Sequence, residues 1–401
     1  MPARRSQFGL DGLNFFAANV QTGFGAFIAV YLTSHAWPEF EIGLALGIGT
    51  LAAMLSQVPA GILVDALTNK RLAAAAALVA IALSGLLFAA WPATLPVMVA
   101  EVLHGFASCV LVPAIAALSL ALVGEAGLGE RVGRNARFAA LGSAIAAGAM
   151  GWVGTYVSGA AVFWLTAAVA LPALGALYAM RGRDLAPRRY PEHHTGTAAR
   201  GLRRLMRDRR VLIFAACCGL FTLANAAMLP LAASAVTRRA SDEANLVVAA
   251  AIILPQAVVA LISPWFGRLA ERIGRRPVLI AGFAALPVRG LLLAVIHDPI
   301  ALALVQALDG ISGAALGVLL PLLAADLTRG TERFNTCLGL FGLAVGIGGT
   351  VSTVVAGAVA GWLGFGVAFA LLAATGLGAL ILLVLTLPET RPREDPLAAL
   401  A

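Results

Sequence analysis

Charged side chains are scarce in this chain. Only 12% of its 401 residues are charged, 60% are hydrophobic, and the mean hydropathy is +0.91. Soluble globular domains carry about 25% charged residues, so this composition excludes an ordinary soluble protein. Polar stretches are also few and short, and between them lie apolar runs of roughly the 20 residues that a bilayer-spanning helix needs. The sequence therefore predicts an integral membrane protein.

Cysteine is scarce in this chain, and a nucleotide-binding motif is missing. The four cysteines, Cys109, Cys217, Cys218 and Cys337, lie in or beside apolar runs. Their spacing fits neither a metal site nor a disulfide framework, so we expect small packing residues and no metal. The chain also lacks the Gly-x-x-x-x-Gly-Lys-Ser/Thr loop that holds ATP phosphates. We therefore expect no cofactor, and energy drawn from a gradient or a partner.

The apolar segments themselves predict an all-α membrane protein with twelve transmembrane helices. Backbone groups cannot stay unpaired in hydrocarbon, and the runs are too long and too weakly alternating for barrel strands. The predicted spans are 8–33, 41–62, 72–91, 95–123, 134–157, 161–180, 211–237, 244–266, 278–296, 299–323, 335–360 and 364–387.

The net charge of +8 follows the predicted topology. All but three of the 28 Lys and Arg residues fall at the termini or in alternate loops, the exceptions being Arg238, Arg239 and Arg289. This is the positive-inside pattern, which predicts a multi-pass protein of the cell inner membrane with both termini in the cytoplasm. The basic charge then marks topology and attraction to the lipid bilayer rather than to nucleic acid.

The longest polar stretch, residues 181–210, divides the chain into residues 1–180 and 211–401, each with six predicted helices. Stretches of the two halves match at an offset of about 205 residues. The matched pairs are Asn19 with Asn225, Pro59 with Pro264, Gly61 with Gly267, Asp65 with Glu271, Glu101 with Gln306, His104 with Asp309, and Gly105 with Gly310. Two repeated six-helix bundles joined by a basic cytoplasmic linker are typical of alternating-access transporters, whose substrate site lies between the repeats.

The stretch "GRLAERIGRRP" at 267–277 carries a family resemblance. It resembles the cytoplasmic loop signature that the major facilitator superfamily carries between the second and third helices of a half. The chain as a whole resembles a bacterial-type member of that family with 12 helices. The first half keeps a partial copy, "GILVDALTNKR", and "PET" at 388–390 is similar to the family's common C-terminal ending. The resemblance implies a cytoplasmic gate made by Gly61, Asp65, Lys70, Arg71, Gly267, Glu271, Arg272, Gly274, Arg275 and Arg276.

Ionisable groups within the predicted spans need a partner or a water-filled path, because each costs at least about 2.5–3.5 kcal/mol at the centre of a helix. Glu101 and His104 share one face of the fourth span, while Asp309 lies in the tenth and Arg289 in the ninth. A carboxylate in a partly dry cavity can take up and release a proton, so Glu101, His104 and Asp309 are candidates for proton coupling. The alternative is structural: an Arg289–Asp309 ion pair, and a Glu101–His104 bond that joins helices.

In this superfamily the first helix of each half lines the cavity. By resemblance, neutral polar residues there and in the tenth span are candidate substrate contacts, although Asn and Gln also form ordinary interhelical hydrogen bonds. These candidates are Asn14, Asn19, Gln21, Asn225 and Gln306. Asp11, nearer the cytoplasmic edge, fits a helix-end or gate charge. Many family members carry Arg at the position of Glu101, so the charge is inverted here.

Glycine recurs in two spans, which predicts close helix packing. The fifth contains Gly148, Gly151 and Gly154, and the eleventh contains Gly339, Gly342, Gly346 and Gly349. The fifth span lacks the Gly-Pro signature that drug/proton antiporters of this superfamily typically carry there.

We expect a secondary active transporter, not an enzyme, that acts as a monomer. It would move a small organic solute, neutral or amphiphilic because fixed charges in the predicted cavity are few, and export it in exchange for protons. Uptake by proton symport is the alternative within transport. An intramembrane enzyme would need a cluster such as His-x-x-Glu-His, and a transporter-like sensor would need an added signalling domain.

Overall fold

The computed structural model describes residues 4–24, 26–185, 198–237, 244–296, 298–331 and 333–391, and every regular element among them is a helix. The all-α membrane fold predicted from the sequence is therefore confirmed. The elements are α1 (Arg4–Thr22), α2 (Ala26–Ser34), α3 (Glu39–Ala66), α4 (Lys70–Ala90), α5 (Thr94–Val123), α6 (Leu128–Tyr156), α7 (Gly159–Ala179), a 3₁₀ turn (Gly182–Leu185), α8 (Ala198–Leu205), α9 (Arg209–Asn225), α10 (Met228–Thr237), α11 (Ala244–Ile273), α12 (Arg275–Val295), α13 (Pro299–Val305), α14 (Ala307–Leu327), α15 (Phe334–Leu363) and α16 (Phe365–Thr386).

Each of the twelve predicted spans coincides with a helix or a pair of helices. By length and composition, eleven of the described helical segments can cross a membrane, and the first predicted span is not among them. That span carries more polar residues than the others and is divided into α1 and α2. Residues 186–197 of the predicted linker, Arg238, Arg239 and the C-terminal tail from 392 lie outside the described residues.

Three predicted spans are interrupted, which the sequence did not indicate. The breaks fall between α1 and α2, between α9 and α10, and at Gln306 between α13 and α14. Backbone donors at the breaks find other acceptors, as they must in hydrocarbon. Ala227 donates its N–H to Ser352 Oγ at 3.1 Å, and the Gln306 N–H bonds Ala303 O at 3.1 Å.

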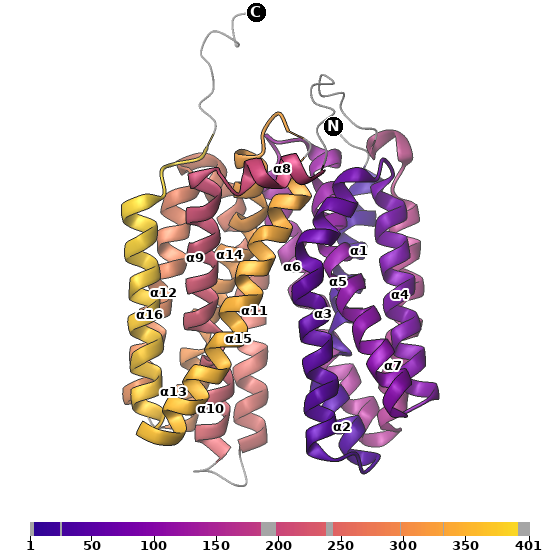
Figure 1. The fold of residues 1–401 in the computed structure, drawn as a ribbon, viewed down its shortest axis with the longest axis vertical. Coiled ribbons are helices and arrows are strands. Elements are labelled where there is room, and N and C mark those ends of the chain that lie inside the picture. Colours follow the sequence, from indigo (N-terminus) through magenta and orange to yellow (C-terminus); the bar gives the residue numbers. More distant parts are fainter. Residues whose placement is uncertain are drawn as a thin grey trace, which may run out of the picture.

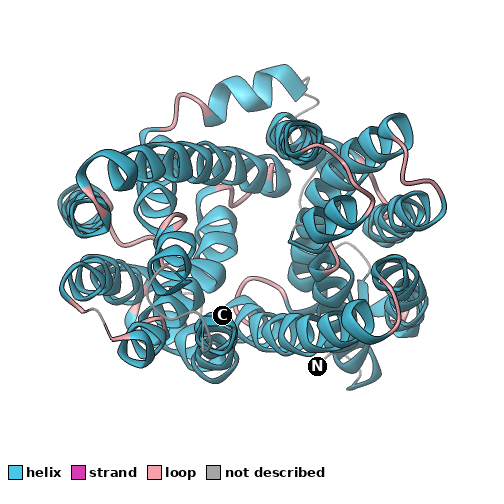
Figure 2. Cartoon of the chain, turned by 90° about the horizontal axis from the view of Figure 1, so that it is seen from below, coloured by secondary structure: helices cyan, strands magenta, loops and turns pink. Residues whose placement is uncertain are grey.

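The helices form two groups, seen side by side in Figure 1 and from below in Figure 2. The first group comprises α1 to α7, in which α5 packs on α3 and α4, and α1 packs on α6 and α7. The second comprises α9 to α16, in which α9 packs on α15, and α12 packs on α14 and α16. Across the groups, α3 packs along α15 and α6 along α11. These two helix pairs therefore form the main interface.

Figure 1 shows the start of α1, the end of α16 and α8 at one end of the molecule, and α2, α10 and α13 at the other. We call these the linker end and the far end. At the linker end, α3 and α11 continue beyond the predicted spans to Ala66 and Ile273. The prediction that the "GRLAERIGRRP" stretch is a loop was therefore wrong: only Gly274 separates α11 from α12. Charged residues outside hydrocarbon are compatible with a helix, so the end of the apolar run did not mark the end of the helix.

Candidate functional site

Asp65 joins the two groups at the linker end. It lies near the end of α3, and its carboxylate accepts hydrogen bonds from the first residues of α15 in the other group. The donors are the Asn335 N–H at 3.0 Å, the Asn335 side-chain amide at 2.8 Å, the Thr336 N–H at 2.7 Å and the Thr336 hydroxyl at 2.6 Å. A negative charge at a helix N-terminus also interacts favourably with the helix dipole. Asp65 thus caps a 30-residue helix of the opposite group.

Glu271 repeats this arrangement with the groups exchanged. It lies near the end of α11 and accepts the Glu130 N–H at 3.2 Å, in the first turn of α6. The pairing of Asp65 with Glu271 in the sequence repeat therefore corresponds to two equivalent caps, one in each direction across the interface. Because Asp65 accepts four half-buried hydrogen bonds and Glu271 accepts an exposed bond, both caps can break and reform.

Glycines bring the backbones of the paired helices together beside the caps. A Cβ on Gly61 would lie 2.2 Å from Asn335 O, and one on Gly339 would lie 2.2 Å from Gln57 O. On the other pair, a Cβ on Gly267 would lie 2.1 Å from Gly129 O. Real Cβ contacts are never this short, so the helices can approach this closely only with glycine at these positions.

The other predicted gate residues bind within their own groups. Lys70 Nζ donates to backbone carbonyls at the end of α3, including Leu67 O at 2.6 Å. Arg71 lies 5.3 Å from the Tyr178 ring centroid and donates to Tyr178 O at 3.4 Å. The Arg272 side chain is exposed, and its carbonyl accepts a bond from Arg391 at 2.6 Å. Their role in a gate stays a prediction.

Arg275 and Arg276 are held against the segment that follows α16. Arg275 forms an ion pair with Asp326 at 3.1 Å, and the Arg275 and Arg276 N–H groups donate to the Glu389 carboxylate at 2.8 and 3.0 Å. Burial opposes the charge of Glu389, but backbone N–H donors at the start of α12 and beside Glu389 outweigh it and lower its pKa. Gly274 has φ of +108°, and a Cβ there would lie 2.4 Å from Glu389 Oε2. The "PET" segment thus caps α12.

Two contacts between the groups were missed by sequence reasoning. Arg329 forms an ion pair with Glu125 at 2.5 Å, and Arg137 Nε donates to Ala260 O at 2.8 Å. Arg137 lies at the start of a predicted span and Arg329 follows one. At such positions the positive-inside pattern alone accounts for an arginine. Nothing in the sequence distinguishes a cross-group partner from an ordinary interfacial arginine.

Within the second group, four polar side chains meet at the breaks in two spans. The Arg289 side chain is 1% exposed and reaches from α12 to α9 and α14. It donates to Asn225 Oδ1 at 2.6 Å, to Asp309 Oδ1 at 2.7 Å and to Gln306 Oε1 at 2.9 Å. Asn225 is the last residue of α9, and Gln306 separates α13 from α14. We call these residues the Arg289 cluster.

The Arg289 cluster is not closed. The Asp309 side chain is 23% exposed, and the Gln306 amide nitrogen is buried without a hydrogen-bond partner among the described residues. Helix α14, which carries Asp309, also contacts α6 of the first group. The cluster therefore combines one buried cation, one partly accessible carboxylate and one unused donor near the interface of the groups.

Glu101 and His104 do not bond each other among the described contacts. Glu101 is 5% exposed, packs on Gly49 of α3 and has one buried carboxylate oxygen without a hydrogen-bond partner in the described part of the chain. His104 bonds Ser108 Oγ at 3.2 Å and stacks on Phe24, with ring centroids 3.7 Å apart. The alternative of a Glu101–His104 bond was therefore wrong, because the His104 ring turns towards the break after α1.

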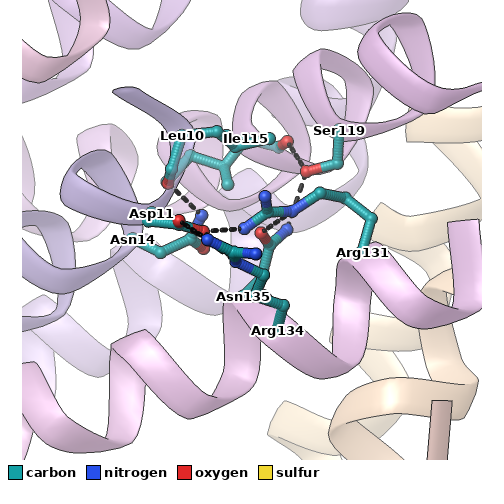
Figure 3. A network of polar contacts seen from close by, with 8 residues as sticks. All are labelled: Leu10, Asp11, Asn14, Ile115, Ser119, Arg131, Arg134 and Asn135. Atoms are coloured by element: carbon teal, nitrogen blue, oxygen red, sulfur yellow. Dashed lines mark hydrogen bonds and ion pairs between the residues drawn. The ribbon is translucent and has the colours of Figure 1, made fainter. Parts of the chain in front are cut away.

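The polar residues of the first helix are divided between two surroundings. Asn19 is buried, Gln21 is half-buried, and Asn14 donates to Leu10 O of its own helix at 2.7 Å. Figure 3 shows Asp11 instead at the centre of a network with two arginines of α6. Arg134 Nε donates to Asp11 at 2.9 Å, and Arg131 forms an ion pair with the same carboxylate.

This Asp11 network stays inside the first group. Arg131 donates to Asn135 Oδ1 at 2.8 Å, and Asn135 donates to Ser119 Oγ of α5 at 2.7 Å (Figure 3). It links α1, α6 and α5 near the linker end. Asp11 therefore holds the first group together in this conformation.

The glycine prediction is only partly confirmed. Gly339 and Gly342 pack against Gln57 of α3, but a Cβ on Gly148 or Gly151 would meet nothing within 4 Å. Gly357, further along α15, is also open. The prediction of packing was wrong for Gly148 and Gly151; the glycines of α6 that do meet α11 are Gly129 and Gly133, nearer the linker end.

Comparisons with known proteins agree with this architecture. A family profile of the Major Facilitator Superfamily matches residues 10–252 and 224–400. An uncharacterized MFS-type transporter of Mycobacterium tuberculosis, found in strains CDC 1551 / Oshkosh and ATCC 25618 / H37Rv, is 34% identical over 393 residues, which is 95% of this chain and 93% of the relative.

Solved structures share the fold at lower identity. A crystal structure of the E. coli fucose:proton symporter FucP matches with a TM-score of 0.76 and 17% identity, and covers 94% of this chain and 97% of its own. A structure of FucP in the outward conformation gives a TM-score of 0.75 and 15% identity over the same shares. At these identities the likeness shows the fold alone.

Proposed function

The chain belongs to the major facilitator superfamily and is a multi-pass membrane transporter, not an enzyme, and we propose that it exports a small organic solute in exchange for protons. The solute is neutral or amphiphilic. The two helix groups, residues 1–180 and 211–401, move against each other around the linker at 181–210, and the linker end faces the cytoplasm of a cell with both termini on that side.

The single observation that supports proton coupling is the surroundings of Asp309. Asp309 is a carboxylate paired at 2.7 Å with a buried arginine, yet 23% of its side chain stays exposed. A proton can therefore reach it without unfolding the helix. When Asp309 is charged, it compensates Arg289. When Asp309 is protonated, Arg289 is left buried with only neutral partners, which is unfavourable unless the surroundings rearrange.

Rearrangement is possible because the Arg289 cluster lies at two helix breaks. Asn225 ends α9 and Gln306 ends α13, so changed bonds to Arg289 act on segments that are already separate. A proton shifts a conformational equilibrium only when the two states bind it with different affinity. The Arg289–Asp309 pair supplies this difference if its geometry changes between the states.

The linker end acts as the inner gate. The caps by Asp65 and Glu271 close it. Further from the linker end, a Cβ on Gly148 of α6 or Gly357 of α15 would meet no atom within 4 Å. In the opposite state the caps break and the far ends approach. Such a switch exposes a site between the groups first to one side of the membrane and then to the other.

The test uses purified protein in liposomes with an imposed pH gradient. For each of a panel of neutral and amphiphilic solutes, the direction of solute movement is compared with the direction of proton movement. A pH-sensitive dye inside the liposomes reports the protons. We expect at least one solute to move against the proton flux, and Asp309→Asn to uncouple it. Asp298→Asn is the matched control, because Asp298 only caps α13 and Asn serves equally well as a cap. Equal coupling in Asp309→Asn and wild type would refute Asp309 as the coupling group.

Proton symport is the second candidate. Two observations favour it: α6 contains no proline, and the same fold in FucP belongs to a fucose:proton symporter. In the liposome assay, symport would appear as solute and protons that move in the same direction.

A further inference from the structure

A groove of about 670 Å³ runs along the outside of the first group, between α1 and α7. It is lined by Arg5, Phe8, Gly9, Phe16, Pro172, Gly175, Ala176 and Ala179. We propose that it holds an acyl chain of an anionic phospholipid whose headgroup phosphate is bound by Arg5.

The floor of the groove is a close crossing of two helices. A Cβ on Gly9 would lie 2.8 Å from Ala176 O, so α1 and α7 touch there. Pro172, Gly175, Ala176 and Ala179 recur on α7 at the spacing of one helix face. Gly175 is exposed and has no atom within 4 Å of a Cβ position. Small residues thus keep the groove open along its length.

The length of the groove matches one leaflet of a bilayer. Arg5 and Phe16 are both lining residues, and at 1.5 Å per residue they are about 17 Å apart along α1. One leaflet supplies about half of a hydrocarbon core of about 30 Å. Arg5, in the first turn of α1 at the linker end, then lies at the membrane surface, and the apolar walls extend below it.

The charge around the opening favours an anionic headgroup. Arg4, Arg5, Arg181 and Arg183 are all exposed at the ends of the two helices. Ser6 keeps these ends together, because it accepts the Arg181 N–H at 3.0 Å and donates to Asp184 at 2.5 Å. Among these described residues four arginines outnumber one acid, Asp184, so their summed charge is positive.

Among the residues that the structure describes, none of the second group lines the groove. The groove therefore lies outside the interface that moves during transport, where lipid rather than solute is the neighbour. Arg5 is the charged residue among its described lining residues, and Phe8 is 65% exposed. A phospholipid with a negative headgroup and an extended apolar chain satisfies both ends.

The experiment is native mass spectrometry of the detergent-released full chain, mixed with equal amounts of phosphatidylglycerol and phosphatidylcholine. We expect wild type to retain phosphatidylglycerol in preference. Arg5→Gln should lower that retention about fivefold, since one arginine near an anionic headgroup contributes about 1 kcal/mol. Arg210→Gln is the control, an exposed arginine at the linker end of the second group.

A second variant tests the groove itself. Gly175→Leu should lower retention of both lipids, whereas Gly378→Leu, at an open and exposed position on α16, should not. Equal retention of the two lipids by wild type, or unchanged retention in Gly175→Leu, would overturn the proposal. A dimer that disappears in Gly175→Leu would overturn it too, in favour of a second copy as the occupant.

Discussion

Arg289 is the residue on which the mid-membrane polar contacts converge. It donates to Asn225, Gln306 and Asp309, three residues that the sequence repeat and the family resemblance had already selected. The structure brings these three together and contains the Arg289–Asp309 pair that was one of two sequence-based alternatives. Because Asp309 is both paired and partly exposed, it fits the structural ion pair and the proton-coupling carboxylate alike. The two alternatives do not exclude each other.

We predict that the pair stabilises the fold only as a pair. Arg289→Gln leaves the Asp309 carboxylate without its cation, which should lower the free energy of unfolding by about 3 kcal/mol or more. The double variant Arg289→Gln with Asp309→Asn removes both charges and should recover most of that loss. Thermal unfolding in detergent measures both. A double variant as unstable as Arg289→Gln alone would show that the guanidinium acts through packing instead.

Gly274 should tolerate no side chain. Its φ of +108° and ψ of 169° cost an L-residue about 1–3 kcal/mol, and a Cβ would also collide with the Glu389 carboxylate. Gly274→Ala should therefore destabilise the protein more than Gly330→Ala, because Gly330 has φ of +71° but open space around it. Thermal unfolding of the two variants separates backbone strain from the collision, and equal losses would argue against the Glu389 contact.

The cap made by Glu389 should depend on pH. Its pKa is lowered below the ordinary value of 4.5, so its contribution is complete above that value and is lost as the pH falls through the lower folded-state pKa. Glu389→Gln should lose about 0.5–1 kcal/mol at neutral pH. The difference from wild type, followed by unfolding at decreasing pH, should vanish in acid. A difference that grows below pH 4.5 would reverse the sign of the argument.

At the scale of helices, the sequence predicted twelve spans well but not their interruptions or ends. Apolar residues continue through the breaks near Asn225 and Gln306, so periodicity gave no sign of them. What interrupts the helices is tertiary: a Ser352 hydroxyl that accepts a freed N–H and a buried arginine that holds the side chains. The helix ends at Ala66 and Ile273 were missed because charged residues ended the apolar run before the helix ended.

The glycine crossing between α3 and α15 should be essential for closure of the linker end. A Cβ on Gly339 would lie 2.2 Å from Gln57 O, and overpacking of this kind costs about 1–3 kcal/mol. Gly339→Ala should then lower the equilibrium constant for closure by roughly 5- to 150-fold and slow transport in liposomes. Gly148→Ala, at an open position, should transport like wild type. An unimpaired Gly339→Ala that unfolds normally would mean that the close crossing is not needed.

At the scale of the molecule, the repeat visible in the sequence becomes two caps that point in opposite directions across one interface. Asp65 of the first group binds α15, and Glu271 of the second binds α6. Sequence pairing predicted that these acids were equivalent. It did not predict their partners, because the N-terminal turns of α6 and α15 carry no motif that marks them as donors to a distant carboxylate.

The central claim is that the proton on Asp309 biases which end of the interface is closed. The most direct measurement is pulsed electron paramagnetic resonance between spin labels in the two groups, with Leu72→Cys and Arg210→Cys at the linker end, and Leu95→Cys and Trp362→Cys at the far end. All four positions are exposed. Acidification should lengthen the linker-end distances and shorten the far-end distances, and Asp309→Asn should show the acid distribution at every pH. A response to pH that is the same in Asp309→Asn and wild type would contradict the account.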